Sequence, residues 1–272
     1  MWFRGGISLL PAASCVALTM ANGSLAAIAK VRDLGTCPQT SGTTSVVGTI
    51  TVVAAGAAAG HLVVVSVVTA GDPSMTQAIA VTDSASNTYT LDANVPVWAG
   101  LGNNRRTYIL SSVLANPIPG SGTITVTMTG GTPNNGVNVC AVATEFSGVL
   151  AMGRLDKTAT GIGQSNMPVT AATATTTQAA ELLYGAVGTD DQAGFAAGAG
   201  YTALPSSGST PYLNPEFRIV NATGAYTAGA TVTNSTNWGV AIATYKDACA
   251  ADTTVPAVTP PPTLTTTQTL CM

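Results

Sequence analysis

Two short segments one hundred residues apart carry nearly the same sequence, AVATEF at Ala141–Phe146 and AIATYK at Ala241–Lys246. Three further pairs of segments precede them in the same order: GHLVVV at 60–65 with AELLYG at 180–185, RTYIL at 106–110 with EFRIV at 216–220, and TITVT at 123–127 with ATVT at 230–233. The spacing between partners shrinks along the chain, so the connections differ while the order of segments holds. We interpret the pattern as a diverged internal duplication of one supersecondary unit.

Each of these segments has the pattern of a β-strand. Leu62–Thr69 (LVVVSVVT) is a continuous apolar run, which is typical of a strand buried on both faces. ITVTMT at 124–129 instead alternates apolar residues with threonine, as expected for a strand with one buried face. Turn-forming PIPG at 117–120 and GGTPNNG at 130–136 flank that strand. The segments therefore predict an all-β protein.

The most economical architecture is a β-sandwich with a jelly-roll-like arrangement, built from two diverged repeats of about four strands each that supply one core. Two separate small sandwiches are the alternative. We place the repeat units at about 44–148 and 168–248, within a sandwich domain spanning 27–248. Residues 1–26 form an N-terminal extension or a signal-like segment, and residues 249–272 form a Thr/Pro-rich tail that serves as a linker or as an arm toward a neighbouring subunit.

The composition excludes several classes of protein. Only 8% of the 272 residues are charged, against roughly 25% in an ordinary soluble domain. The nine basic residues are scattered and the net charge is −3, which argues against binding nucleic acid through its phosphates. The body of the chain has no apolar run of about 20 residues, so we expect no membrane span. Low charge with abundant Thr, Gly and Ala is typical of extracellular or virion proteins.

None of the five cysteines lies in a CxxC pair, so their spacing indicates neither a zinc site nor a redox motif. Cys37 and Cys249 flank the sandwich domain, and a disulfide between them is one alternative that the spacing leaves open. Cys140 lies in an expected core strand, where a small buried side chain is the simpler interpretation.

Catalytic groups are scarce. The single histidine, His61, stands at the head of an apolar strand, and the chain has no GxSxG motif for a serine nucleophile. Glu145, Glu181 and Glu216 lie on expected strands and are the candidates for a pair of facing acids, as in a glycosidase. The few tryptophans argue against a sugar-cleaving cleft. We therefore expect no enzyme and assign no catalytic residue.

Two acidic turns have oxygen ligands of the kind that calcium prefers. Asp83 and Asn87 bracket the polar turn DSASN, whose alternative reading is an Asx-turn hairpin. Asp190 and Asp191 are adjacent carboxylates, either solvated in a loop or bridged by a cation. Calcium is the only cofactor that the sequence leaves open.

Four other residues are candidates for an interface. Trp98 and Tyr212 lie in expected loops, and the only basic doublet, Arg105-Arg106, follows Trp98 closely. Trp, Tyr and Arg are enriched where subunits meet, so we expect these residues at a contact with a partner. The alternatives are that the aromatic rings anchor their own loops, or that they stack on a sugar.

The succession GHLVVVSVV, VTDSASNTYTL, RTYIL, GTITVTM, VATEFSGV, ELLYGAVG, GAGYTAL, TGAYTAGATV and WGVAIATYK, over roughly 27–246, resembles a β-sandwich module of tailed-phage structural proteins and of bacterial surface or secreted proteins. The resemblance implies a building block of a virion or a cell surface. It implies no active-site residues.

We expect a non-enzymatic structural protein of a virion or another large extracellular assembly: a decoration, fibre or lattice subunit that contacts copies of itself or other assembly proteins. The alternative is a secreted bacterial cell-surface adhesin or carbohydrate-binding module, for which a glycan is the partner.

Overall fold

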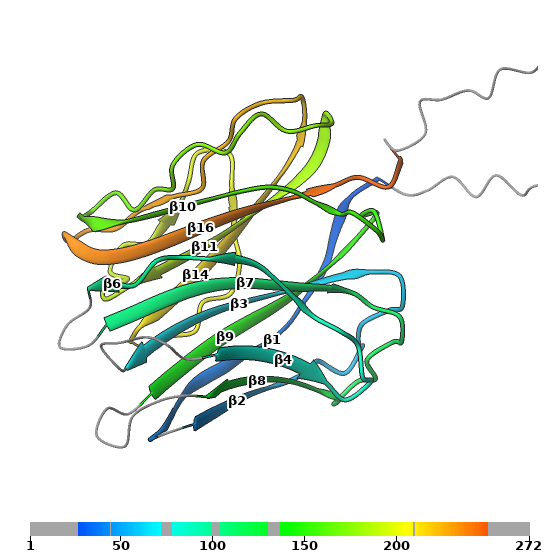
Figure 1. Cartoon of the computed structure of the whole chain (residues 1–272), viewed down its shortest axis with the longest axis horizontal. Coiled ribbons are helices and arrows are strands. Elements are labelled where there is room, and N and C mark those ends of the chain that lie inside the picture. Colours follow the sequence, from blue (N-terminus) through cyan, green and yellow to red (C-terminus); the bar gives the residue numbers. More distant parts are fainter. Residues whose placement is uncertain are drawn as a thin grey trace, which may run out of the picture.

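The strands of the chain lie in two large and two small antiparallel sheets (Figure 1). The computed structural model describes residues 27–43, 45–71, 78–99, 104–129, 137–208 and 210–249. Within these ranges the chain forms strands and their connections, and no α-helix. The predicted all-β sandwich class is therefore confirmed.

The first unit runs from β1 to β9. Its large sheet contains, in order, β1 (Ala29–Gly42), β9 (Val137–Ser147), β3 (Leu62–Gly71), β7 (Asn104–Val113) and β5 (Thr90–Asn94), with β6 (Trp98–Ala99) also paired to β7. Its small sheet contains β2 (Ser45–Thr51), β8 (Thr123–Thr129) and β4 (Ala78–Asp83). The chain passes repeatedly from the large sheet to the small sheet and back, which is the path of a jelly roll.

The second unit runs from β10 to β16 and has the same strand order. Its large sheet contains β10 (Leu155–Ser165), β16 (Thr236–Lys246), β11 (Ala180–Thr189), β14 (Tyr212–Asn221) and β13 (Thr202–Ala203). Its small sheet is reduced to β12 (Ala196–Ala197) and β15 (Ala230–Thr231), with a single bridge between Val169 and Gly229. Strands β1 and β10 lie outside the unit bounds expected from sequence, and the duplication itself stays a prediction.

The four sheets form layers with three hydrophobic cores between them, rather than the single core that we expected. The first core fills the space between the first unit's two sheets and includes Val65 and Val126. The second lies between the two large sheets and joins residues such as Val64 and Tyr184. The third underlies the second small sheet and includes Leu183 and Ile242. Each unit is therefore a sandwich of its own, and the two share a middle core.

The two matching hexapeptides face in opposite directions. On β9, Ala141 and Ala143 point into the first unit's own core, and Val142 points into the middle core. On β16, Ala241 and Ala243 point into the middle core instead, while Ile242 points into the second unit's core. Because side chains alternate along a strand, a shift of one residue exchanges the two faces. An alignment that pairs Ala141 with Ala241 therefore does not pair residues at equivalent positions of the two sheets. The equivalent residues differ from this alignment by an odd number of positions.

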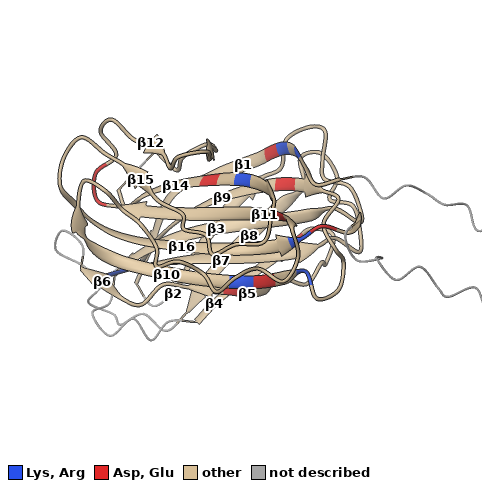
Figure 2. Cartoon of the chain, turned by 90° about the horizontal axis from the view of Figure 1, so that it is seen from above, with Lys and Arg blue, Asp and Glu red and all other residues tan. Residues whose placement is uncertain are grey.

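The two large sheets face each other with their strand orders reversed, so that β5 of the first contacts β10 of the second, and β7 contacts β16. Figure 2 shows how few charged residues these strands carry.

Cys37 is buried in the first core whereas Cys249 is exposed, so they do not form the disulfide left open above. The N-terminal extension and nearly all of the predicted tail lie outside the described residues. In the described ranges, no helix has the length and apolar character to cross a membrane.

Candidate functional site

Trp98 is an internal anchor and does not lie on an exposed surface. Its side chain is only 2% exposed and belongs to the middle core. The ring packs against Gly239 of β16 so closely that a Cβ atom at that glycine would lie 2.3 Å from it. Next to this contact, the hydroxyl of Thr107 donates to the carbonyl of Gly239 at 2.9 Å. Among our three interpretations of Trp98, the structure agrees with loop anchoring.

Arg105 is also internal, because its guanidinium forms a buried ion pair with Asp190. The second carboxylate oxygen of Asp190 accepts a hydrogen bond from Asn237 at 3.3 Å. This ion pair joins the start of β7 in the first unit to the end of β11 in the second. Arg106 points to the opposite face of β7, since neighbouring side chains alternate. Tyr212 is half-buried at the start of β14.

Asp83 organises the turn that the sequence offered as a calcium site. Its carboxylate accepts hydrogen bonds from the amides of Ala85 and Asn87, from the Asn87 side chain at 2.9 Å and from the Tyr89 hydroxyl at 3.0 Å. Burial, followed by the charge of Asp83, raises the pKa of Tyr89 well above its usual range. The turn thus has the hydrogen bonds of the Asx-turn alternative.

The two acidic turns do not meet. Asn87 donates to the carbonyl of Asn116, just beyond the C-terminal end of β7, whereas Asp190 contacts Arg105 near its N-terminal end. Asp191 accepts hydrogen bonds from the amide of Ala193 and the side chain of Asn234. Within the described ranges, no group of three or more His, Cys, Asp and Glu is placed to hold a metal ion. Calcium binding stays a prediction.

The three strand glutamates point away from the middle core on opposite sides of the molecule. Glu145 faces the first unit's own core from β9, where it is fully buried and lies 2.9 Å from Arg32 and 2.7 Å from His61. Glu181 and Glu216 lie on the outer face of the second large sheet, on β11 and β14. The two units' outer faces are separated by both large sheets, so the three acids do not form a common site.

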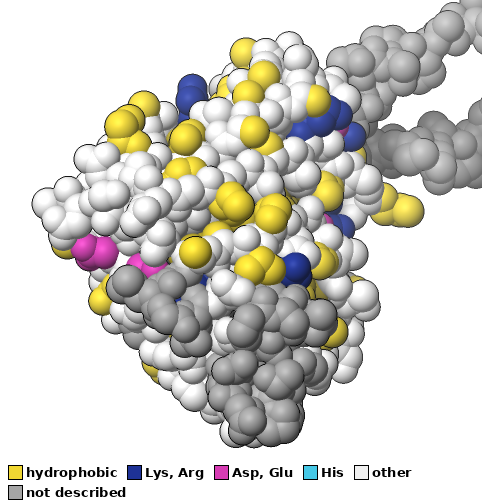
Figure 3. Space-filling model, turned by 60° about the vertical axis from the view of Figure 1, so that its left-hand side comes forward, with side chains coloured by type: hydrophobic (Ala, Val, Ile, Leu, Met, Phe, Trp, Pro, Cys, Tyr) yellow, Lys and Arg dark blue, Asp and Glu magenta, His cyan; other side chains and the backbone are white. Residues whose placement is uncertain are grey.

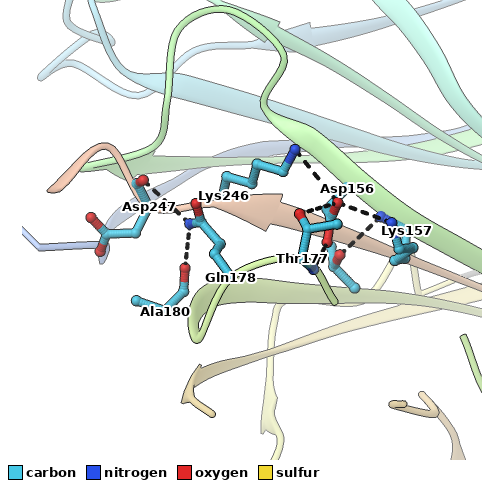
Figure 4. Close-up of polar contacts among 8 residues, drawn as sticks. Asp156, Lys157, Thr177, Gln178, Ala180, Lys246 and Asp247 are labelled. Atoms are coloured by element: carbon cyan, nitrogen blue, oxygen red, sulfur yellow. Dashed lines mark hydrogen bonds and ion pairs between the residues drawn. The ribbon is translucent and has the colours of Figure 1, made fainter. Parts of the chain in front are cut away.

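Figure 4 shows a second polar cluster, around Asp156 at the start of β10. The carboxylate accepts hydrogen bonds from the amide and hydroxyl of Thr177 at 2.5 and 2.7 Å and lies 3.2 Å from Lys157 and 3.5 Å from Lys246. Burial alone would raise the pKa of Asp156, but the hydrogen bonds from Thr177 and Lys157 hold it well below its usual range.

Glu181 lies behind this cluster and is fully buried. Burial raises the pKa of Glu181 to about 7, and the neighbouring Asp156 carboxylate acts in the same direction. Two carboxyl groups with pKa values driven apart resemble an acid–base pair. No solvent reaches Glu181, however, so a substrate has no route to it. The cluster fastens β10 to the segment before β11.

A groove of about 540 Å³ lies on the outer side of the second unit. It is lined by two tyrosines, one arginine and small or apolar residues: Met167, Pro168, Val169, Ala197, Gly198, Ala199, Tyr201, Arg218, Ala225, Tyr226, Thr227, Gly229, Ala230 and Thr231. None of its three large polar side chains was among our predicted site residues. The sequence contains one signal that could have indicated the groove. In EFRIV at 216–220, side chains alternate between the two faces of a strand, so Glu216 and Arg218 lie on the same face.

No protein-family model, curated protein or solved structure matches the chain. The groove and the polar clusters must therefore be interpreted from their own chemistry.

Proposed function

We propose that the protein is a non-enzymatic structural subunit of a virion or another large extracellular assembly, and that β10 contacts a second copy of the chain. The support comes from a difference between β1 and β10, which are the edge strands at matching places in the two large sheets. The resemblance to tailed-phage structural and bacterial surface modules agrees with this proposal.

Strand β1 has the features that keep an edge strand from pairing with another chain. It carries Lys30, Arg32 and Asp33, and its register against β9 shifts at three places. Charged side chains and bulges of this kind block the addition of a further strand. The first unit's edge is therefore protected.

Strand β10 lacks this protection over Thr158–Ser165. This stretch carries no charge and pairs with β16 without a register shift. The carbonyl of Thr160 points away from β16 and accepts the amide of Ala171 at 3.1 Å. Because hydrogen-bonding directions alternate along an antiparallel strand, the backbone groups of Ile162 and Gln164 point the same way. A strand from a second copy can pair with these groups.

Exposed apolar side chains lie close to this edge in the chain. Ile162, Met167 and Val169 are 47%, 62% and 45% exposed. Figure 3 shows a face on which hydrophobic side chains lie among uncharged ones, with few Lys, Arg, Asp or Glu. Such a surface associates through many weak contacts, which symmetry repeats in an assembly.

Ile162→Lys tests the proposal, since an added charge at an edge strand opposes pairing. We expect the wild-type chain to form dimers or larger species as its concentration rises in sedimentation velocity, and Ile162→Lys to stay monomeric. Thr36→Lys, at an exposed position on the protected strand β1, should behave as wild type. A wild-type chain that stays monomeric at millimolar concentration, or a variant that associates equally well, would contradict the proposal.

A further inference from the structure

The groove lies where the second small sheet is too short to cover its large sheet. In the first unit, β2, β8 and β4 have seven, seven and six residues and close over a continuous core. In the second unit, β12 and β15 have two residues each. The groove is lined by residues of these two paired strands and of the segments beside them, and its volume of about 540 Å³ falls in the range of about 300–1,000 Å³ that is common for small-ligand sites.

Two tyrosine rings stand in the groove in fixed positions. The hydroxyl of Tyr201 donates to the carbonyl of Thr227 at 2.8 Å, and the hydroxyl of Tyr226 donates to the carbonyl of Ala222. Both rings pack partly against the second unit's core and are half-buried. Because the rings are already ordered, a ligand that stacks on them loses little of its binding energy to fixing them.

Arg218 brings a positive charge to the groove, and among the described residues it has no ion-pair partner. It is exposed on the outer face of β14. Its guanidinium lies over Gly200, where a Cβ atom would come within 3.3 Å of it. The guanidinium is therefore placed at the groove and available to an anion.

Glu216 is the acid beneath the groove, and its carboxylate is committed to the backbone. Its two oxygens accept the amides of Gly198 and Gly229 at 2.8 and 2.9 Å. Both glycines line the groove. The carboxylate thus holds together the two segments that form the floor. Burial raises the pKa of Glu216 to about 7, which leaves it partly neutral near pH 7 and weakens its competition for Arg218.

We propose that the groove binds a saccharide that carries a carboxylate, with sugar rings against Tyr201 and Tyr226 and the carboxylate on Arg218. The apolar faces of sugar rings stack on aromatic side chains, and the planar guanidinium forms paired hydrogen bonds with a carboxylate. This proposal does not rest on the assembly proposed above, although Met167 and Val169 line the groove and also belong to the exposed apolar surface near β10.

The test uses the full chain and two ligands with the same sugar rings, an oligogalacturonate and its methyl ester, of which only the first carries carboxylate charges. Isothermal titration calorimetry should show binding of the acid and at least tenfold weaker binding of the ester. Arg218→Gln should weaken binding of the acid at least tenfold and leave the ester unchanged. Sialyllactose and an alginate oligomer, set against lactose, extend the test to other acidic sugars.

Lys30→Gln is the matched control, because it removes one positive charge from the other unit and should leave binding unchanged. Tyr226→Phe keeps the ring and should retain most of the affinity, whereas Tyr226→Ala should lose it; thermal unfolding then establishes that each variant is folded. Equal binding of acid and ester, or wild-type affinity in Arg218→Gln, overturns the proposal. So does the failure of all three acidic sugars to bind at millimolar concentration.

Discussion

Of the three fully buried glutamates, Glu145 and Glu216 are held in different ways. Glu145 lies between Arg32 and His61 and also accepts the amide of Ala58 at 2.8 Å. Glu216 has only the amides of two glycines among its described partners. Burial therefore outweighs hydrogen bonding at Glu216 and raises its pKa from 4.5 to about 7.

Glu216 should make the protein less stable as the pH rises toward neutrality. Between pH 4.5 and 7 the folded chain binds a proton at Glu216 that the unfolded chain has released, so the stabilisation is complete below about 4.5 and is lost by about 7. Each unit of pKa difference corresponds to about 1.4 kcal/mol. We expect the free energy of unfolding, measured by urea titration at pH 5, 6, 7 and 8, to fall across this range.

Glu216→Gln provides the control for this effect. It should flatten the pH dependence, leaving the part that comes from Glu181, whose pKa is also raised to about 7. The variant should also be about 1–3 kcal/mol less stable at pH 5, because its amide NH₂ faces a glycine N–H that then lacks an acceptor. An unchanged pH profile would show that Glu216 does not carry the effect.

At the scale of the strand, close approach between elements depends on particular glycines. Gly239 leaves room on β16 for the ring of Trp98, which comes from β6 of the other unit. Gly35 on β1 packs against the backbone of Thr51, and Gly161 on β10 packs against the backbone of Val169. A Cβ atom there would meet the carbonyl oxygens of Thr51 and Val169 at 2.9 and 2.2 Å. These positions fix how closely neighbouring elements pack.

Gly239→Ala should therefore disturb the contact between the two large sheets. Overpacking a buried site costs roughly 1–3 kcal/mol, and the fixed position of Trp98 places this variant at the upper end. Urea unfolding of the single variants and of the double variant with Trp98→Leu gives the coupling between the two sites. We expect the double variant to lose less stability than the sum of the single losses. If the losses in the free energy of unfolding were additive, the Trp98 ring and residue 239 would not be in direct contact.

At the scale of the whole molecule, the shared core makes the two units depend on each other. Ser66 of β3 and Tyr184 of β11 hydrogen bond across it at 3.0 Å, and Arg105 and Asp190 form their buried ion pair at one end. Each large sheet covers apolar surface of the other. Separation of the units would expose that surface, so we expect them to unfold together.

Asp190→Ala tests this dependence. Removing one partner of a buried ion pair leaves the other charge buried without its partner and costs about 3–5 kcal/mol. We expect this loss in scanning calorimetry, in a single transition whose van't Hoff and calorimetric enthalpies agree. The double variant Arg105→Met with Asp190→Leu should recover much of the loss, since it leaves no buried charge. Two separate transitions in the wild-type chain would contradict the shared core.

The sequence by itself determined the all-β class and the place of several strands, because apolar alternation and turn residues are local signals. It did not place β1 and β10 within the expected units, and it put Trp98 and Tyr212 in loops although they lie on β6 and β14. It placed His61 at the head of a strand, and at Asp83 it left a calcium site and an Asx turn open, of which the structure shows the hydrogen bonds of the turn. It did not determine which face of β16 turns inward, because a shift of one residue exchanges both faces and only the packing of the two units selects between them. Trp98 and Arg105 look like surface residues from their neighbours in the chain, and only the contact between the large sheets buries them. The groove of Tyr201, Arg218 and Tyr226 likewise arises in three dimensions, where a short small sheet leaves distant segments side by side.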